Sequence, residues 1–173
     1  MKNLVILGST GSIGRQTLDI VRAFPRRFRV VGLAAGANLS LLKQQVEEFR
    51  PRMVCCADSA GPVDSLPSEC AFTPMEEMAS AAGVDSVMVA TTGRAGLVPT
   101  LRALEARVPV ALANKEVIVM AGELVMAHAK RYNTPILAVD SEPSAIWQCL
   151  RGESRKVSRI IVTASGGAFR DRP

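Results

Sequence analysis

The fold of this chain is decided by the stretch LVILGSTGSIG, residues 4–14. A short apolar run leads directly into three glycines spaced three apart, and a helical pattern begins at Ile13. Glycines permit a tight turn, and Gly11 lets backbone N–H groups approach a pyrophosphate with no side chain in the way. The N-terminus of the helix adds partial positive charge at the same place. The stretch therefore predicts a strand, a phosphate-binding turn and a helix, which together open a dinucleotide-binding domain.

Short apolar runs alternate with longer helical patterns along the rest of the chain, which is typical of a parallel sheet. The runs are almost continuously apolar, as in strands that helices cover on both faces. The predicted strands are 4–7, 29–34, 53–56, 86–90, 109–112, 136–139 and 159–162. The predicted helices are 13–23, 39–49, 75–82, 96–106, 117–131 and 144–150. Residues 57–73 have no clear period and are predicted to be an irregular connection. The predicted fold class is α/β, with a Rossmann-like doubly wound parallel sheet.

We predict a domain boundary at residue 150. Residues 1–150 form the dinucleotide-binding domain in this interpretation, and residues 151–173 begin a second α/β unit. The predicted strand 159–162 is followed by Gly166 and Gly167, and the sequence ends soon afterwards. Because this is an unusual place for a complete domain to end, we expect the sequence to be a fragment.

The 173 residues are 48% hydrophobic and have a net charge of +5, a composition typical of a globular protein. Residues 151–173 hold six basic and two acidic side chains, whereas residues 1–150 hold 15 basic and 14 acidic ones. The aromatic residue in this basic tail is Phe169, and a stacking surface for nucleic acid needs several. We therefore expect no nucleic-acid partner.

Membrane and secretory signals are not found in the sequence. No apolar run reaches the roughly 18 residues of a membrane span, and no signal or transit peptide pattern opens the chain. We therefore expect a cytoplasmic protein with no membrane partner. The four cysteines are Cys55, Cys56, Cys70 and Cys149. Their spacing fits neither a zinc site nor a secreted disulfide framework, and we predict buried thiols.

A polar cluster, Asn114-Lys115-Glu116, follows the predicted strand 109–112, at the sheet edge where ligands bind in folds of this class. Helix capping explains Asn114 and Glu116. It does not explain Lys115, because a cation opposes the dipole at a helix N-terminus. We infer that Lys115 meets an anionic ligand.

The end of the second predicted strand indicates which dinucleotide binds. It reads AAGAN, residues 34–38, with no acid to accept from the ribose hydroxyls of NAD. The absence of this carboxylate favours NADP(H). No Arg or Lys stands in the turn, so Asn38, Ser40 and backbone N–H groups are the candidates for binding the 2′-phosphate.

A second polar cluster, Asp140-Ser141-Glu142, follows the predicted strand 136–139. Carboxylates at i and i+2 of a strand project to the same side and repel each other unless a cation lies between them. Their hard oxygen atoms suit Mg²⁺ or Mn²⁺. The alternative is that one of them caps the helix 144–150.

Two later features were considered as binding groups. The turn TASGG, residues 163–167, can hold a phosphate through Ser165 and backbone N–H groups, or can be an ordinary loop. His128 lies inside the predicted helix 117–131 and is interpreted as a helix-surface residue.

Together these motifs resemble the 1-deoxy-D-xylulose 5-phosphate reductoisomerase family over essentially the whole chain. The matching stretches are 6–14, 113–116, 139–142 with 145–146, and 164–167 with 169–170. The resemblance implies an NADPH-dependent enzyme of non-mevalonate isoprenoid biosynthesis that uses Mg²⁺, Mn²⁺ or Co²⁺. Such enzymes rearrange a phosphorylated sugar, 1-deoxy-D-xylulose 5-phosphate, and reduce the product to 2-C-methyl-D-erythritol 4-phosphate. The resemblance also implies a homodimer, and it makes residues 151–173 the start of the catalytic domain.

The resemblance also implies roles for individual residues. The nucleotide contacts are Thr10, Gly11, Ser12, Ile13, Gly36, Asn38, Asn114 and Glu116. The substrate contacts are Lys115, Ser141, Glu142 and Ser165, and the metal ligands are Asp140 and Glu142. Lys115, Asp140 and Glu142 are thereby the candidate catalytic residues. The chain departs from the family at Pro143, where His is common, and at Ala37, where some members have Lys or Arg. Family members are also about twice as long.

Two other functions remain open from the sequence. A semialdehyde-dehydrogenase-type oxidoreductase would need a cysteine nucleophile paired with a histidine, for which Cys149 and His128 are the candidates. A non-catalytic NADP-binding module would need only the glycine loop. For the 173-residue chain alone we expect no turnover.

Overall fold

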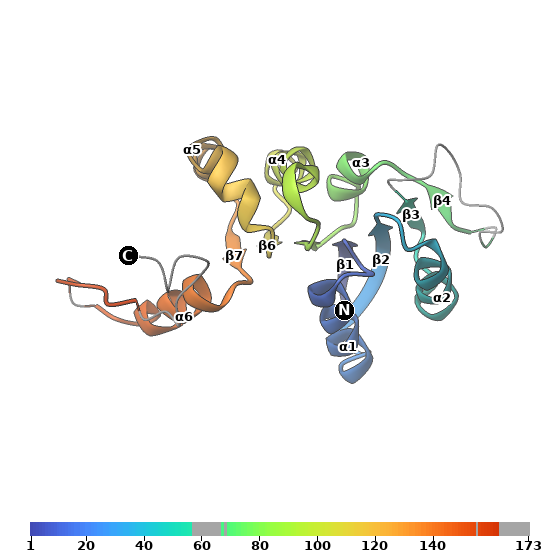
Figure 1. The fold of residues 1–173 in the computed structure, drawn as a ribbon, viewed down its shortest axis with the longest axis horizontal. Helices are drawn as coiled ribbons and strands as arrows, with labels where there is room; N and C mark the ends of the chain where they lie inside the picture. The colour runs from blue at the N-terminus through green and yellow to red at the C-terminus, as the bar shows by residue number, and fades with distance from the viewer. Residues whose placement is uncertain (57–66, 68, 155, 163–173) are drawn as a thin grey trace, which may run out of the picture.

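The computed structural model describes residues 1–56, 67, 69–154 and 156–162, and within them one parallel sheet carries the fold (Figure 1). Its seven strands are ordered β4-β3-β2-β1-β5-β6-β7, and every neighbouring pair is parallel. The strands are β1 Lys2–Leu7, β2 Phe28–Ala35, β3 Met53–Cys56, β4 Ala71–Phe72, β5 Ser86–Val89, β6 Val110–Leu112 and β7 Ile136–Ala138. The chain returns to the middle of the sheet at β5, so the sheet is wound in both directions from β1. The predicted doubly wound α/β fold is confirmed.

The helices cover both faces of this sheet. They are α1 Ser12–Ala23, α2 Leu39–Phe49, α3 Met75–Ala79, α4 Leu97–Glu105, α5 Lys115–Arg131 and α6 Ser141–Leu150, with a short 3₁₀ turn, η1, at Gly93–Gly96. Figure 1 shows α1 and α2 on one side of the strands and α3, α4 and α5 on the other. None of the described helices is long and apolar enough to cross a membrane.

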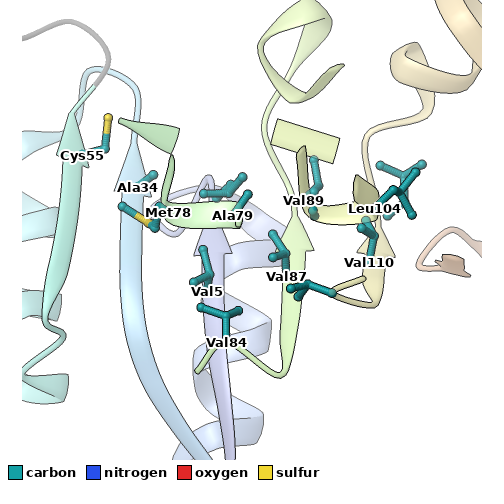
Figure 2. Close-up of a cluster of buried hydrophobic side chains, with 14 of the residues drawn as sticks. Val5, Ala34, Cys55, Met78, Ala79, Val84, Val87, Val89, Leu104 and Val110 are labelled. Atoms are coloured by element: carbon teal, nitrogen blue, oxygen red, sulfur yellow. The ribbon is translucent and has the colours of Figure 1, made fainter. Parts of the chain in front are cut away.

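The alternation of side chains along each strand divides the core between the two faces. Val5 and Leu7 pack with Met78 and Leu104 under α3 and α4, in the cluster that Figure 2 shows. Ile6 instead packs under α1 and α2. Because both faces are covered, the strands need apolar residues at nearly every position, which is why the sequence runs are continuous.

Several predicted elements differ in the structure. Residues 71 and 72 pair with β3 as the short strand β4, although the connection 57–73 was expected to be irregular; residues 57–66 and 68 lie outside the described part. The predicted helix 96–106 is α4, which the 3₁₀ turn η1 precedes. Helix α6 begins at Ser141, three residues earlier than predicted, and α3 ends at Ala79.

The predicted strand 159–162 was wrong in the described structure. These residues form no helix or strand, and their apolar side chains are exposed, Ile161 by 73%. A strand requires a hydrogen-bonded neighbour, and no described strand pairs with this segment. The boundary at residue 150 and the second unit after it remain predictions.

Candidate functional site

The glycine loop lies between the carboxyl end of β1 and the start of α1, where the winding of the sheet reverses. Gly8 has a φ of +87°, and a Cβ there would stand 2.3 Å from the Ala90 carbonyl oxygen. A Cβ on Gly14 would stand 2.2 Å from the Gly8 carbonyl oxygen. Both glycines are therefore needed for backbone packing, which holds the loop tightly against β5 and α1.

Gly11 has a different role in the loop. It is the N-cap of α1 in an ordinary extended conformation, and no side chain caps the helix there. None of the described residues accepts a hydrogen bond from the amides of Thr10, Ser12 or Ile13. Unpartnered amides at a helix N-terminus, next to a residue without a side chain, form a binding site for an anion such as a pyrophosphate.

A cleft of about 350 Å³ adjoins this loop. Its lining residues, all small or uncharged, are Gly8, Thr10, Gly11, Ala35, Gly36, Ala37, Asn38, Met75, Ala90, Thr91, Thr92 and Ala95. A Cβ on Gly36 would meet nothing within 4 Å, so the backbone is open to a ligand at the end of β2. Asn38 is exposed and caps α2 by accepting from the Leu41 amide over 3.0 Å. The described lining carries no carboxylate that would repel a 2′-phosphate.

Asn114 contacts the loop after β5 that lines this cleft, and it is only 1% exposed. Its Oδ1 accepts from the Val117 amide over 3.3 Å, so it caps α5 as predicted. Its Nδ2 donates to Thr91 Oγ1 and to the Gly93 carbonyl oxygen, over 3.1 and 2.9 Å. All of its side-chain polar atoms are thus engaged within the fold. Thr91 and its loop were missed from the sequence, because no motif marks them.

A second cleft, of about 690 Å³, lies at the ends of β6 and β7. Its lining residues are Ile13, Ala113, Lys115, Ala138, Val139, Asp140, Ser141, Ser144, Ala145 and Gln148. Ile13 lies in the first turn of α1, directly after the glycine loop, so the loop lines the first cleft and the start of α1 lines the second. The structure therefore brings Lys115, Asp140 and Ser141 together beside the candidate nucleotide site. Lys115 is exposed in the first turn of α5.

Three other predicted residues that the structure describes line neither cleft. Ser12 and Glu116 are exposed in the first turns of α1 and α5 and line neither cleft. Glu142 lines a neighbouring cavity of about 460 Å³ between α6 and residues 157–162. Ser165 lies outside the described residues.

The two carboxylates are not on a strand, contrary to the prediction. Asp140 is the N-cap of α6, its Oδ1 accepting from the Ser141 amide over 2.8 Å, and Glu142 is in the first turn. Pro143 also stands in this turn, where its missing N–H is not needed, and the helix can therefore begin before it. The described residues contain no group of three potential metal ligands. The carboxylates of Asp140 and Glu142 provide hard oxygen donors, but two residues are only part of a metal-ligand set.

The cysteines and the histidine do not form a second site. Cys55 and Cys56 are buried as predicted, and burial raises the pKa of the Cys55 thiol. Cys70 is only half-buried and Cys149 is exposed on α6, contrary to the prediction. His128 lies 3.5 Å from Glu105 and bonds with the Leu124 carbonyl oxygen. None of these contacts pairs His128 with Cys149.

Comparison with known proteins gives one consistent result. A family model described as 1-deoxy-D-xylulose 5-phosphate reductoisomerase matches residues 4–122. A model of the C-terminal domain of the same enzyme matches residues 136–173. The curated reductoisomerase of Pelotomaculum thermopropionicum is 49% identical over 99% of this chain and 47% of its own length. The chain thus spans about half the length of the curated relatives it matches.

Solved structures agree with these matches. The 1-deoxy-D-xylulose 5-phosphate reductoisomerase from Zymomonas mobilis in complex with NADPH superposes with a TM-score of 0.85. It is 36% identical, and the match covers 99% of this chain and 48% of that one. A DOX-P reductoisomerase in complex with NADPH, fosmidomycin and magnesium superposes with a TM-score of 0.76 at 37% identity, covering 86% of this chain and 39% of that one.

Proposed function

The chain belongs to the 1-deoxy-D-xylulose 5-phosphate reductoisomerase family, and we propose that it is the cofactor-binding part of such an enzyme. The whole enzyme rearranges 1-deoxy-D-xylulose 5-phosphate and reduces the product to 2-C-methyl-D-erythritol 4-phosphate. The observation that carries this proposal is that the glycine loop and the start of α1 border two neighbouring clefts. The first cleft adjoins the open amides, and the second is lined by Lys115, Asp140 and Ser141. A cofactor held in the first cleft can therefore reach a substrate in the second.

The cofactor in this proposal is NADPH, which the residues present fit. The open amides of the loop and Gly11 hold the pyrophosphate, and the turn from Gly36 to Asn38 holds the adenosine part. The absence of a described carboxylate in the first cleft supports a 2′-phosphate at this turn, although Ala37 provides no cation. The resemblance further assigns contacts to Ser12, Ile13, Asn114 and Glu116.

The substrate and the metal ion belong in the second cleft and the neighbouring cavity that Glu142 lines. Lys115 and Ser141 bind the phosphorylated sugar, together with Glu142 and Ser165 in the family pattern. Asp140 and Glu142 provide two oxygen ligands for Mg²⁺, Mn²⁺ or Co²⁺. The remaining ligands come from the part of the family enzyme that this chain does not span. When bound, the metal ion polarises substrate oxygens and NADPH provides the hydride.

The residues of the chain prepare the site for these steps. The ammonium group of Lys115 neutralises negative charge on the substrate, at a place where the helix N-terminus also favours anions. The Asp140 carboxylate is fixed by the Ser141 amide, so it does not need to reorient when a cation binds. Ile13 lines the second cleft and provides an apolar surface next to the glycine loop.

We further propose that residues 151–173 begin the catalytic domain, that the whole enzyme is a homodimer, and that it acts in the cytoplasm. The isolated chain is expected to bind NADPH without turnover. The second cleft favours an enzyme over a non-catalytic NADP-binding module. A module that only binds NADP has no need of Lys115 and Asp140 in one cleft.

In the first test the chain is titrated with NADPH and with NADH, and binding is measured by cofactor fluorescence. NADPH is expected to bind at least tenfold more tightly, and Gly11→Val, which places a side chain among the open amides, is expected to abolish binding. Gly122→Ala is the matched control, because Gly122 on α5 lines neither cleft. Equal affinity for both nucleotides would overturn the NADPH assignment.

A second experiment tests catalysis in a full-length protein containing this sequence. Asp140→Asn and Lys115→Gln are expected to lower metal-dependent turnover at least 100-fold while NADPH binding stays unchanged. NADPH binding without turnover by the unaltered full-length protein would favour the non-catalytic module instead.

A further inference from the structure

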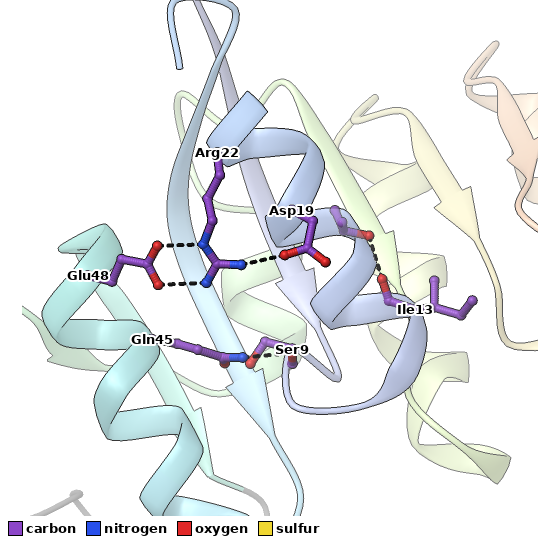
Figure 3. A network of polar contacts seen from close by, with 7 residues as sticks. Ser9, Ile13, Asp19, Arg22, Gln45 and Glu48 are labelled. Atoms are coloured by element: carbon purple, nitrogen blue, oxygen red, sulfur yellow. Dashed lines mark hydrogen bonds and ion pairs between the residues drawn. The ribbon is translucent and has the colours of Figure 1, made fainter. Parts of the chain in front are cut away.

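Helix α2 places a buried amide side chain against the glycine loop. Gln45 is only 3% exposed and lies beside Leu42 and Val46 on the face of α2 that packs against the sheet. Its Nε2 donates to the Ser9 carbonyl oxygen over 3.0 Å, as Figure 3 shows. A buried amide is unfavourable unless it is hydrogen-bonded, so an apolar residue would be expected at this position of the helix. The contact with Ser9 is what distinguishes Gln45 from its neighbours.

The Ser9 residue is held from two sides. Its amide donates to the Ala34 carbonyl oxygen of β2 over 2.8 Å, and its carbonyl oxygen accepts from Gln45 on α2. The C=O and N–H of one trans peptide unit point in opposite directions. The bond to Gln45 therefore fixes the direction of the Thr10 N–H, which is one of the open amides, and Thr10 lines the first cleft.

A separate contact joins α1 to α2 further from the loop. Arg22 forms a two-fold contact with Glu48, Nε to Oε1 and Nη2 to Oε2, each over 2.6 Å, and it also contacts Asp19 (Figure 3). Arg22 and Glu48 are both partly exposed, so this contact is screened by solvent. It aligns the two helices, but it does not touch the loop. Among the described residues, the hydrogen bond from Gln45 to Ser9 is the one that connects a buried side chain of α2 to the glycine loop.

We propose that Gln45 is a positioning residue for the pyrophosphate of the cofactor, acting through the Ser9–Thr10 peptide. This inference rests on the proposed function, since it takes NADPH to be the ligand of the loop. Without the bond, the peptide unit loses the contact that fixes its orientation, and the direction of the Thr10 N–H is no longer set by α2. A hydrogen bond to a charged group is then lost from the complex, which corresponds to about a tenfold weaker affinity.

The test compares Gln45→Met with Gln44→Met in the 173-residue chain. Met keeps the length of the side chain and removes the donor, and it also removes the buried Oε1, which has no partner among the described residues. Gln44 is exposed on the same helix and is the matched control. We expect Gln45→Met to weaken NADPH binding about tenfold and Gln44→Met to leave it unchanged.

Adenosine 2′-monophosphate distinguishes positioning of the loop from displacement of α2. It has no pyrophosphate, so its affinity is expected to change less than twofold in Gln45→Met. An equal loss for both ligands, or no loss for NADPH, would overturn the inference. Failure of the unaltered chain to bind NADPH would overturn the proposed function. Unchanged NADPH binding in Gln45→Met would overturn only the role of Gln45, so the two failures can be told apart.

A measurement on the unaltered chain covers the case in which Gln45→Met does not fold. In the NMR spectrum, adding inorganic pyrophosphate is expected to move the Thr10 amide proton downfield. The Gly83 amide, outside both clefts, is expected to stay in place. A Thr10 signal that does not respond to saturating pyrophosphate would overturn the inference.

Discussion

Asn114 Nδ2 donates to Thr91 Oγ1 over 3.1 Å, which ties the start of α5 to the loop that follows β5. The same nitrogen donates to the Gly93 carbonyl oxygen, and Oδ1 caps α5. A single buried amide thus holds the loop that lines the first cleft against the helix that begins with Lys115. The resemblance assigns Asn114 to the nucleotide, but its side chain is already fully engaged. Any contribution of this side chain to binding is therefore expected to act through the loop.

The first prediction concerns the stability that this amide provides. Asn114→Ala removes a helix cap and leaves the Gly93 carbonyl group without its donor, so the free energy of unfolding is expected to fall by about 2–4 kcal/mol. Asn38→Ala is the matched control, because it removes an exposed cap from α2 and is expected to cost about 1 kcal/mol. Urea denaturation measures both. Equal losses at the two positions would contradict the role assigned to the contacts of Asn114.

The second prediction separates two glycines of the nucleotide site. Gly8→Ala is expected to cost about 3 kcal/mol or more, because the φ is +87° and the added Cβ meets the Ala90 carbonyl oxygen. Gly36→Ala is expected to change stability by less than about 1 kcal/mol, since its Cβ meets nothing. It should nevertheless weaken NADPH binding by occupying the first cleft. Thermal unfolding and NADPH titration of both variants check these outcomes. A stable Gly8→Ala protein would show that the loop can move away from β5.

The central part of this fold was predictable because its signals are local. Six strands follow from continuous apolar runs, and α1 follows from the glycines before Ile13. The strand β4 was missed because two residues, Ala71 and Phe72, are too short to show a period. The start of α6 was misplaced because the helical periodicity covers only residues 144–150, whereas the first turn also contains Pro143, which is tolerated there.

The candidate site was predictable only where residues are adjacent in sequence. Lys115 and Asp140 were each recognised from a polar cluster after a strand, and the sheet places both in one cleft. The contact between Thr91 and Asn114 joins positions 23 residues apart. The contact between Gln45 and Ser9 joins positions 36 residues apart. No local pattern encodes such a contact, because it depends on how the helices pack onto the sheet.

The third prediction concerns Lys115, whose charge opposes the helix dipole. Lys115→Gln is expected to raise the free energy of unfolding by about 0.3–1 kcal/mol, because it removes a cation from the first turn of α5. Lys130→Gln, in the last turn of the same helix, is the matched control and should lower it by a similar amount. Urea denaturation at low ionic strength measures both. Destabilisation by Lys115→Gln would indicate that Lys115 has a structural partner, and would weaken its assignment to the substrate.

The fourth prediction is a pH dependence of stability. The hydrogen bonds from Arg22 hold the pKa of the Glu48 carboxyl below its usual value of 4.5. Because the pKa of the carboxyl is lower in the folded state than in the unfolded state, its ionised form stabilises the fold at pH values above the unfolded pKa. This stabilisation is lost as the pH falls through the folded pKa. Both side chains are 44% exposed, so Glu48→Gln is expected to cost only about 0.5 kcal/mol at pH 7. The difference from the unaltered chain should shrink as the pH falls below 4.5, as thermal unfolding over a series of pH values would measure. Glu47→Gln is the control, since Glu47 forms no ion pair with any described residue. A Glu48→Gln effect that grows towards acid would contradict the assigned ion pair.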